Sequence, residues 1–241
     1  MSTLQQPYKV VRLAAAIYAK WTKSSYKSLK GTKVTVSGVT YKITEDIEGQ
    51  TGTATITKAQ KATKVPTSFK TQDRSFNVTE IGDSAFKGNK AIKTASTGNN
   101  IKKIGKNAFN GCTKLKTVKL GKNVTSIGAN AFTGCSVLSS VTLGDKLTTI
   151  GDKAFYNLPK LTKITIPSKV NKIGKSAFEK CKALKSITIK TTLLTDKNVG
   201  SKAFASINAS AKVKVPKTKL KDYQKLLKKK GISGKKQKIT K

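Results

Sequence analysis

Hydrophobic residues return at a fixed interval of 23 positions through the middle of the chain. The clearest marker is a phenylalanine, which recurs as Phe86, Phe109, Phe132, Phe155 and Phe178. In each copy an alanine directly precedes the phenylalanine, and an Ile-Gly pair begins five residues before it. A constant period in this range is typical of solenoid proteins, in which every repeat forms one coil. We count six coils, with an irregular coil at either end.

Each coil should contribute one strand to a sheet. In one copy Leu115, Val118 and Leu120 follow a Leu-x-x-Val-x-Leu pattern. Residues 116–120 are therefore expected to form a strand, with positions 117 and 119 pointing outward. Stacked coils would place equivalent strands side by side at about 4.8 Å, which gives a parallel sheet along one face.

The residues around the phenylalanine predict a second element. Ala108, Phe109 and Cys112 are spaced so that they share one side of a short helical turn, and Gly105 permits a tight bend before it. Strand, bend and helical turn make each coil an α/β-type unit. Because one such coil cannot cover its own apolar faces, we expect a single elongated body in which each coil packs on its neighbours.

The outward strand positions form a candidate binding surface, which we call the strip. They carry mostly hydroxyl groups with a few lysines, and neither a carboxylate nor an aromatic ring. Threonine also favours exposed strands for purely structural reasons, so a face without any ligand is the alternative. The strip comprises Thr94, Ser96, Thr117, Lys119, Ser140, Thr142, Lys163, Thr165, Ser186, Thr188, Lys212 and Lys214.

The flanks of the solenoid have their own patterns. Alternating residues with turn signals between them predict an N-terminal β cap over residues 34–78, followed by the solenoid over residues 79–216. Over residues 217–241 a helical period predicts a C-terminal capping helix that ends at Gly231, followed by a basic tail that we expect to be frayed.

Residues 1–33 are expected to be a helix or linker packed on the first cap. Their apolar set, at roughly helical spacing, is interrupted by Lys9, Arg12 and Lys20, so it fits neither a membrane span nor a secretory signal. A basic amphipathic helix at a membrane surface is the functional alternative. The segment could also be part of a longer protein.

The inventory of reactive side chains argues against an enzyme. Histidine is absent, and the carboxylates are too scattered to assemble a nucleophile, a base and an orienting group. Cys112, Cys135 and Cys181 occupy one repeat position that also accepts Leu158, so they should be buried thiols. A disulfide between Cys112 and Cys135 on adjacent coils is conceivable. We expect no cofactor and no catalytic residue.

One cluster of acidic residues could bind a cation. Glu45, Asp46 and Glu48 lie close together in a predicted turn, but their spacing matches no calcium loop. A solvated turn is the better interpretation, so we expect no metal site.

The charge of the chain is strongly positive, with 49 basic against 11 acidic residues and a net charge of +38. Arg12 and Arg74 are the two arginines, so lysines supply the rest. Lysines that stack in register about 5 Å apart repel by roughly 0.8 kcal/mol even in water, and an anionic partner would relieve that repulsion. The excess could instead serve solubility.

Nucleic acid is a second candidate partner. The charge would support non-specific binding to nucleic acid or another polyanion. Specific recognition is not expected, because aromatic residues make up 6% of the chain and are mostly the repeat phenylalanines. Those rings should be buried, which leaves no platform for stacking bases.

The repeat frame Ile-Gly-x-x-Ala-Phe-x-x-Cys-x-x-Leu-x-x-Val-x-Leu resembles that of the BspA-type bacterial leucine-rich repeats, over about residues 79–216. Residues 41–44, 76–86 and 215–231 are similar to the caps of that family. The resemblance implies a leucine-rich-repeat solenoid, a secreted or cell-surface location, and adhesion or protein binding rather than catalysis. A protein or an anionic glycan is the expected ligand. No sorting motif or wall repeat supports the location independently.

Overall fold

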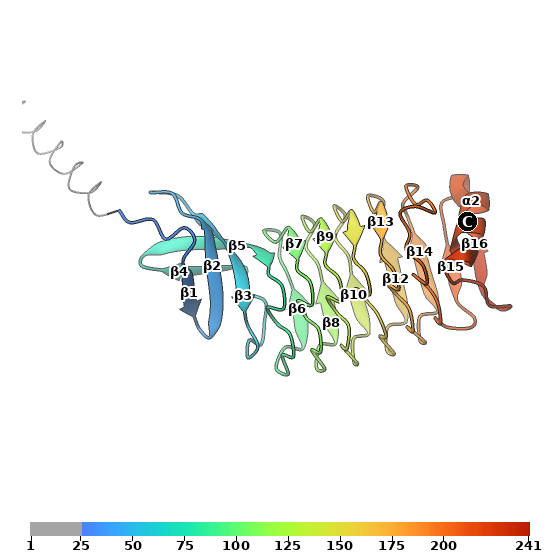
Figure 1. Cartoon of the computed structure of the whole chain (residues 1–241), viewed down its shortest axis with the longest axis horizontal. Coiled ribbons are helices and arrows are strands. Elements are labelled where there is room, and N and C mark those ends of the chain that lie inside the picture. The colour runs from blue at the N-terminus through green and yellow to red at the C-terminus, as the bar shows by residue number, and fades with distance from the viewer. Residues whose placement is uncertain (1–25) are drawn as a thin grey trace, which may run out of the picture.

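The computed structural model describes residues 26–241. The chain forms a row of stacked coils, with a β-rich cap at the N-terminal end and helix α2 (Leu220–Lys229) at the other (Figure 1). The predicted solenoid with a parallel sheet on one face is confirmed. The helix or linker that we expected over residues 1–33 falls mostly outside the described residues.

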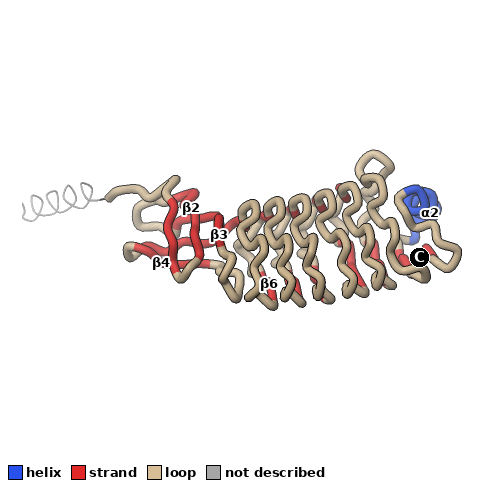
Figure 2. Tube along the Cα trace, turned by 60° about the horizontal axis from the view of Figure 1, so that its bottom comes forward, coloured by secondary structure: helices blue, strands red, loops and turns tan. Residues whose placement is uncertain are grey.

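The N-terminal cap contains five strands, which pack around a core of buried aromatic and aliphatic side chains. Tyr41 and Phe69 stack with ring centroids 3.9 Å apart, and Phe69 lies 5.3 Å from Phe76. Figure 2 shows these strands in red at one end of the molecule. The strands are β1 (Lys33–Val36), β2 (Val39–Glu45), β3 (Gly52–Lys58), β4 (Ser68–Thr71) and β5 (Arg74–Ile81).

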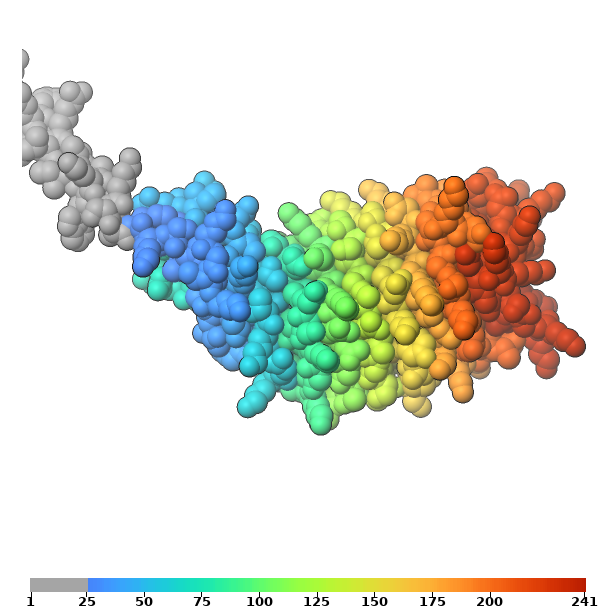
Figure 3. Space-filling view, viewed as in Figure 1, coloured from blue at the N-terminus to red at the C-terminus, as the bar shows by residue number. Residues whose placement is uncertain are grey.

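The cap is hydrogen-bonded directly to the solenoid. Strands β1, β2 and β3 form an antiparallel meander, β4 pairs antiparallel with β5, and β5 pairs parallel with both β3 and the first short strand of the coils. The cap sheet therefore continues into the coils through β7, whereas β6 is the edge strand of its own sheet. In the space-filling view the surface runs on from the cap into the coils without interruption (Figure 3).

A ladder of two-residue strands runs along one side of the coils. Each strand has one buried isoleucine and one outward polar residue, and all pair in parallel with their neighbours. Two residues are too few to show an alternating pattern, so our sequence analysis missed this ladder. It consists of β7 (Lys103–Ile104), β9 (Ser126–Ile127), β11 (Thr149–Ile150) and β13 (Lys172–Ile173).

The predicted strands form a second row, which we call the front row. Each buries its central apolar residue, wholly or in part, and turns the flanking residues outward, as alternation requires. The front-row strands are β6 (Thr94–Ser96), β8 (Thr117–Lys119), β10 (Ser140–Thr142), β12 (Lys163–Ile166), β14 (Ser186–Ile189), β15 (Lys212–Lys214) and β16 (Lys238–Thr240).

The front row is divided into two sheets between β10 and β12, a boundary that we call the seam. Beside the earlier strands, glycines allow very close stacking: a Cβ on Gly121 would lie 1.4 Å from the carbonyl oxygen of Gly98, and one on Gly144 would lie 2.2 Å from that of Gly121. The next coil carries Pro167 at this position. The pairing of the front row is absent at this coil, while β9 and β11 remain paired behind it.

The prediction of a short helical turn is wrong. In every coil the residue two positions before the phenylalanine has a left-handed backbone, with φ of 55° at both Asn107 and Asn130. Such a residue interrupts a right-handed helix. The turn amides instead bond to the next coil, where Phe109 N–H donates to the carbonyl of Ala131 at 2.8 Å. The turns therefore form a third ladder that joins the coils.

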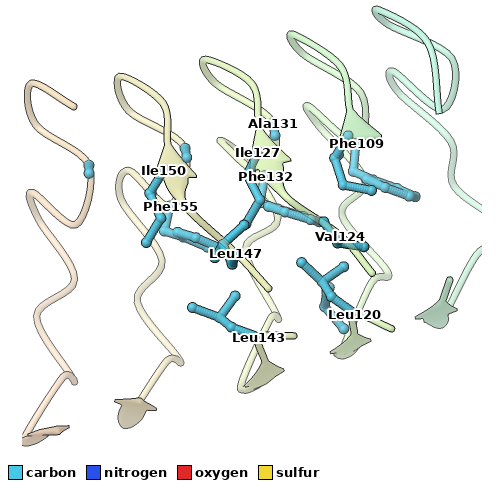
Figure 4. Packing of buried hydrophobic residues seen from close by; sticks show 14 of the residues in the cluster. Phe109, Leu120, Val124, Ile127, Ala131, Phe132, Leu143, Leu147, Ile150 and Phe155 are labelled. Atoms are coloured by element: carbon cyan, nitrogen blue, oxygen red, sulfur yellow. The ribbon is translucent and has the colours of Figure 1, made fainter. Parts of the chain in front are cut away.

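Six phenylalanine rings form a continuous stack through the interior. Neighbouring centroids from Phe86 to Phe204 lie 4.8 to 5.4 Å apart, and every ring is fully buried. Figure 4 shows Phe109, Phe132 and Phe155 in successive coils, close to the aliphatic side chains of the same coils. Each coil therefore covers the ring of the coil before it.

Helix α2 covers the last coil and buries Tyr223, Leu226 and Leu227. The hydroxyl of Tyr223 donates to the carbonyl of Thr191 and accepts from Leu194 N–H, which ties the helix to the loop before it. A short 3-10 turn (Lys217–Lys219) leads into the helix.

The prediction of a frayed tail after Gly231 is also wrong. Residues Lys238–Thr240 form strand β16, which pairs parallel with β15 and adds a strand to the front row. Ile239 packs against the core at the place that Val213 takes in β15. The end of the chain thus completes the sheet.

Candidate binding face

The structure brings the predicted strip residues together on the outward side of the front row. They lie in two rows that cross the strands, because equivalent residues are in register from coil to coil. All are exposed except Thr117 and Thr188, which are half-buried. The first row holds Thr94, Thr117, Ser140, Lys163, Ser186 and Lys212, and the second holds Ser96, Lys119, Thr142, Thr165, Thr188 and Lys214.

Strand β16 adds two residues that our sequence analysis missed. Lys238 is in register with Lys212, and Thr240 is in register with Lys214. The signal was present in the sequence, because Lys-Ile-Thr repeats the polar-apolar-polar pattern of Lys212-Val213-Lys214. It was too short to stand out in a segment rich in lysine.

The lysines of the strip have no acidic partner among the described residues. The carboxylates that form ion pairs lie at other places, where Glu80 pairs with Lys103 and Asp222 with Lys219. Asp196 pairs with both Lys229 and Lys230, and their hydrogen bonds lower the pKa of its carboxyl group to about 2. The positive charge of the strip is therefore not neutralised within the protein.

The acidic cluster in the cap is neither the cation site nor the fully solvated turn that we considered. Asp46 is buried, and it accepts hydrogen bonds from Arg74 at 2.7 Å and from Leu29 N–H at 2.6 Å. Glu45 and Glu48 remain exposed. Between residues 26 and 241 no group of acidic or cysteine side chains is arranged to hold a metal ion. The cluster instead ties the start of the described chain to the cap.

The three cysteines are buried free thiols, as we predicted, and no disulfide joins Cys112 to Cys135. Each thiol donates to the carbonyl of a phenylalanine in a preceding coil, for example from Cys181 to Phe155 at 3.0 Å. Burial raises the pKa of the Cys181 thiol to about 12. Contact with Cys112, together with burial, raises the pKa of Cys135. Buried thiols of high pKa are poor nucleophiles.

The deeper hollows lie at the caps and not on the strip. One of about 510 Å³ lies between helix α2 and the loop around Asp196, and its lining includes Lys219 and Lys229. Its lining carboxylates form ion pairs with lysines. None of the hollows at the two caps of the described chain is lined by a residue of the strip. An open sheet face suits an extended ligand better than a small molecule.

The described part of the chain contains no helix with the length and apolar character that crossing a membrane requires. The one α-helix in this part, α2, has ten residues and carries four lysines. It serves as the cover of the last coil.

Comparison with known proteins supports the repeat assignment. The family model for the BspA type leucine rich repeat region matches residues 63–157 and 102–227, with six copies. No curated protein matches the chain. Two solved structures share its fold. A leucine-rich repeat protein from Bacteroides ovatus has 22% sequence identity and a TM-score of 0.54, over 77% of this chain and 59% of that one.

The leucine rich repeat protein of T. pallidum has 22% identity and a TM-score of 0.55, over 82% of this chain and 96% of that one. Because the match covers 59% of the Bacteroides protein, this chain spans less than two thirds of that protein's length. At such identities the likeness concerns the fold alone. The same repeat is indicated by the six matched copies, by the period of 23 residues and by the ladders that join the coils. The chain belongs to the family of BspA-type leucine-rich-repeat proteins.

Proposed function

We propose that this protein is a non-catalytic binding module, secreted or held at the bacterial cell surface, that mediates adhesion or protein interaction through the strip. Proteins with this repeat are generally surface-type proteins of bacteria that act as interaction modules and are generally not enzymes. The ligand is a protein or an anionic glycan.

The observation that carries the proposal is the strip itself. Its hydroxyl and ammonium groups point outward from seven strands, and within the described chain no carboxylate neutralises them. The buried side of each strand provides the packing, so the outward groups are available to contact a ligand. The hydroxyls could contact protein or sugar, and the lysines would attract anionic groups.

A second candidate is a non-specific binder of nucleic acid or other polyanions. The net charge of +38 favours it, since lysines occur on every side of the solenoid and not only on the strip. The buried phenylalanine stack speaks against base recognition, because its rings cannot reach a ligand.

The experiment is a binding series with a sulfated glycosaminoglycan, an anionic cell-wall polymer, an uncharged polysaccharide and short DNA, each measured at several salt concentrations. The proposal predicts binding to the anionic glycans that weakens steeply as salt rises. Equal binding to DNA and glycan at equal charge density would favour the second candidate. If no polymer binds, the anionic ligand is rejected and protein partners of the strip are the remaining ligand class.

A further inference from the structure

We propose that the C-terminal segment of the strip, from β12 to β16, is the site that holds an anionic glycan, with the sugar chain lying across the strands. The recognising ammonium groups belong to Lys163, Lys212, Lys214 and Lys238. This assignment rests on the proposed function of the strip as a binding surface. It adds the position of the contacts, the direction of the ligand and its chemical class.

The lysines of the strip are concentrated on one side of the seam. Before the seam, the outward residues of β6, β8 and β10 are hydroxyl side chains apart from Lys119. After it, four of the eight outward residues are lysines, and the last two strands contribute Lys212, Lys214 and Lys238. The seam therefore separates a hydroxyl-rich segment from a basic one.

The basic segment places three ammonium groups close together. Lys212 and Lys238 are in register on adjacent strands, about 4.8 Å apart at the backbone. Lys214 is on the same side of its strand as Lys212, about 7 Å further along. The three charges repel one another, and their side chains are exposed. Sulfate or carboxylate groups placed between them would turn this repulsion into attraction.

Hydroxyl groups lie in the same two rows as the lysines. Ser186 stands between Lys163 and Lys212 in the first row, and Thr188 stands between Thr165 and Lys214 in the second. A hydroxyl both donates and accepts hydrogen bonds, so these groups suit the hydroxyls of a sugar chain. The first row, from Lys163 to Lys238, spans three strand spacings, or roughly 14 Å.

The same surface disfavours other polymers. The outward positions of β12 to β16 carry no aromatic ring on which a neutral sugar or a nucleobase could stack. Charge and hydroxyl chemistry together fit a polysaccharide that carries sulfate or carboxylate groups.

The test compares two fourfold variants that remove the same charge. The front variant is Lys163→Gln, Lys212→Gln, Lys214→Gln and Lys238→Gln. The control variant is Lys102→Gln, Lys106→Gln, Lys172→Gln and Lys175→Gln, whose residues are exposed beside strands β7 and β13. Affinity for a sulfated glycosaminoglycan, such as a size-defined oligosaccharide, is measured at several salt concentrations.

We expect the front variant to bind about tenfold more weakly at 0.15 M salt, with a shallower salt dependence, because fewer counterions are released on binding. The control variant should bind within about twofold of the wild-type protein. Equal losses in the two variants would overturn the assignment, since they would mean a uniform field of charge. Tighter binding of DNA than of glycan at equal charge would overturn the ligand class.

Thermal unfolding of both variants checks that the fold is retained. If the front variant is unstable, Lys212→Gln and Lys238→Gln are measured singly against Lys106→Gln. Each front substitution should then weaken glycan binding more than Lys106→Gln does, by less than the fourfold variant would. Failure of the wild-type protein to bind any anionic glycan would contradict the anionic part of the proposed function itself. That result differs from equal losses in the two variants, which would leave anion binding intact.

Discussion

Each coil is anchored by one phenylalanine that has no contact with water. The ring of Phe132 lies between those of Phe109 and Phe155, at centroid distances of 5.3 and 5.2 Å, and it is fully buried. Such parallel offset rings combine burial of a large apolar surface with favourable ring geometry. The phenylalanine therefore stabilises the contact of its own coil with both neighbours.

Replacement of Phe132 by alanine should lower the free energy of unfolding by roughly 3 to 5 kcal/mol, because it leaves a cavity between two packed coils. Urea denaturation followed by circular dichroism measures the change. Val137→Ala in the same coil is the control, since Val137 is 40% exposed, and it should change stability by less than about 0.5 kcal/mol. A change near zero for Phe132→Ala would contradict the stack.

The cysteines should react slowly with thiol reagents in the folded protein. With the pKa of Cys181 raised from 9.0 to about 12, its thiolate is scarce up to about pH 11, whereas in the unfolded chain it forms above about pH 8. Contact with Cys135 lowers the pKa of Cys112, but all three cysteines are buried, so a thiol reagent should label them slowly at pH 8 and rapidly in urea.

The same shift of the Cys181 pKa makes its contribution to stability dependent on pH. That contribution is complete below the unfolded pKa near 9 and is lost as the pH rises toward 12. Fast labelling of the native protein at pH 8 would show that the thiols are accessible, and would contradict the burial described above.

At the level of elements, hydrogen bonds between coils follow three ladders, and one of them is interrupted. In the front row Lys116 N–H donates to the carbonyl of Lys93 at 2.8 Å, and Lys185 N–H donates to that of Thr162 at 3.0 Å. The equivalent bond from Thr162 N–H to Ser139 does not form in the described structure. The two coils at the seam are held by the other two ladders.

The seam predicts a local difference in hydrogen exchange. The amide of Thr162 should exchange much faster than the amides of Lys116, Ser139 and Lys185, which are bonded to the preceding coil. Exchange followed by NMR at neutral pH resolves these four positions. Protection of Thr162 equal to that of its counterparts would show that the front row is continuous.

The alternation of apolar and polar residues sufficed to predict the longer elements. The strand around Val118 and the capping helix around Tyr223 were both expected, since each has several residues in phase with its period. The strand around Ile104 and strand β16 were missed because each offers a single apolar residue that faces the core. The left-handed turn at Asn107 was mistaken for a helix, because side-chain spacing does not report backbone handedness.

The residues of the candidate site were likewise predicted in part and missed in part. Outward positions such as Thr117 and Lys119 could be read from the alternation, and the structure places them on the exposed side. Lys238 could not, because its place depends on the pairing of β16 with β15. The seam could not either, because it depends on how the strands of successive coils pair, which a single sequence does not reveal. Which residues bind a ligand stays a prediction.

At the scale of the whole molecule, the protein is a row of coils with both ends covered. The cap sheet joins one end through β5, and helix α2 with strand β16 closes the other. The front row is a long face whose outward lysines become more frequent toward the C-terminal end. We propose that ligand binding uses this gradient, with the lysines of β12 to β16 making the main contacts.

The most direct test of this account is a lysine footprint. The protein is acetylated briefly with and without a sulfated glycosaminoglycan, and mass spectrometry reports the loss of reactivity at each lysine. We predict strong protection at Lys163, Lys212, Lys214 and Lys238, and little at Lys102, Lys106, Lys172 and Lys175 on the other ladder. Uniform protection of all lysines, or protection confined to the other ladder, would contradict the strip as the binding surface.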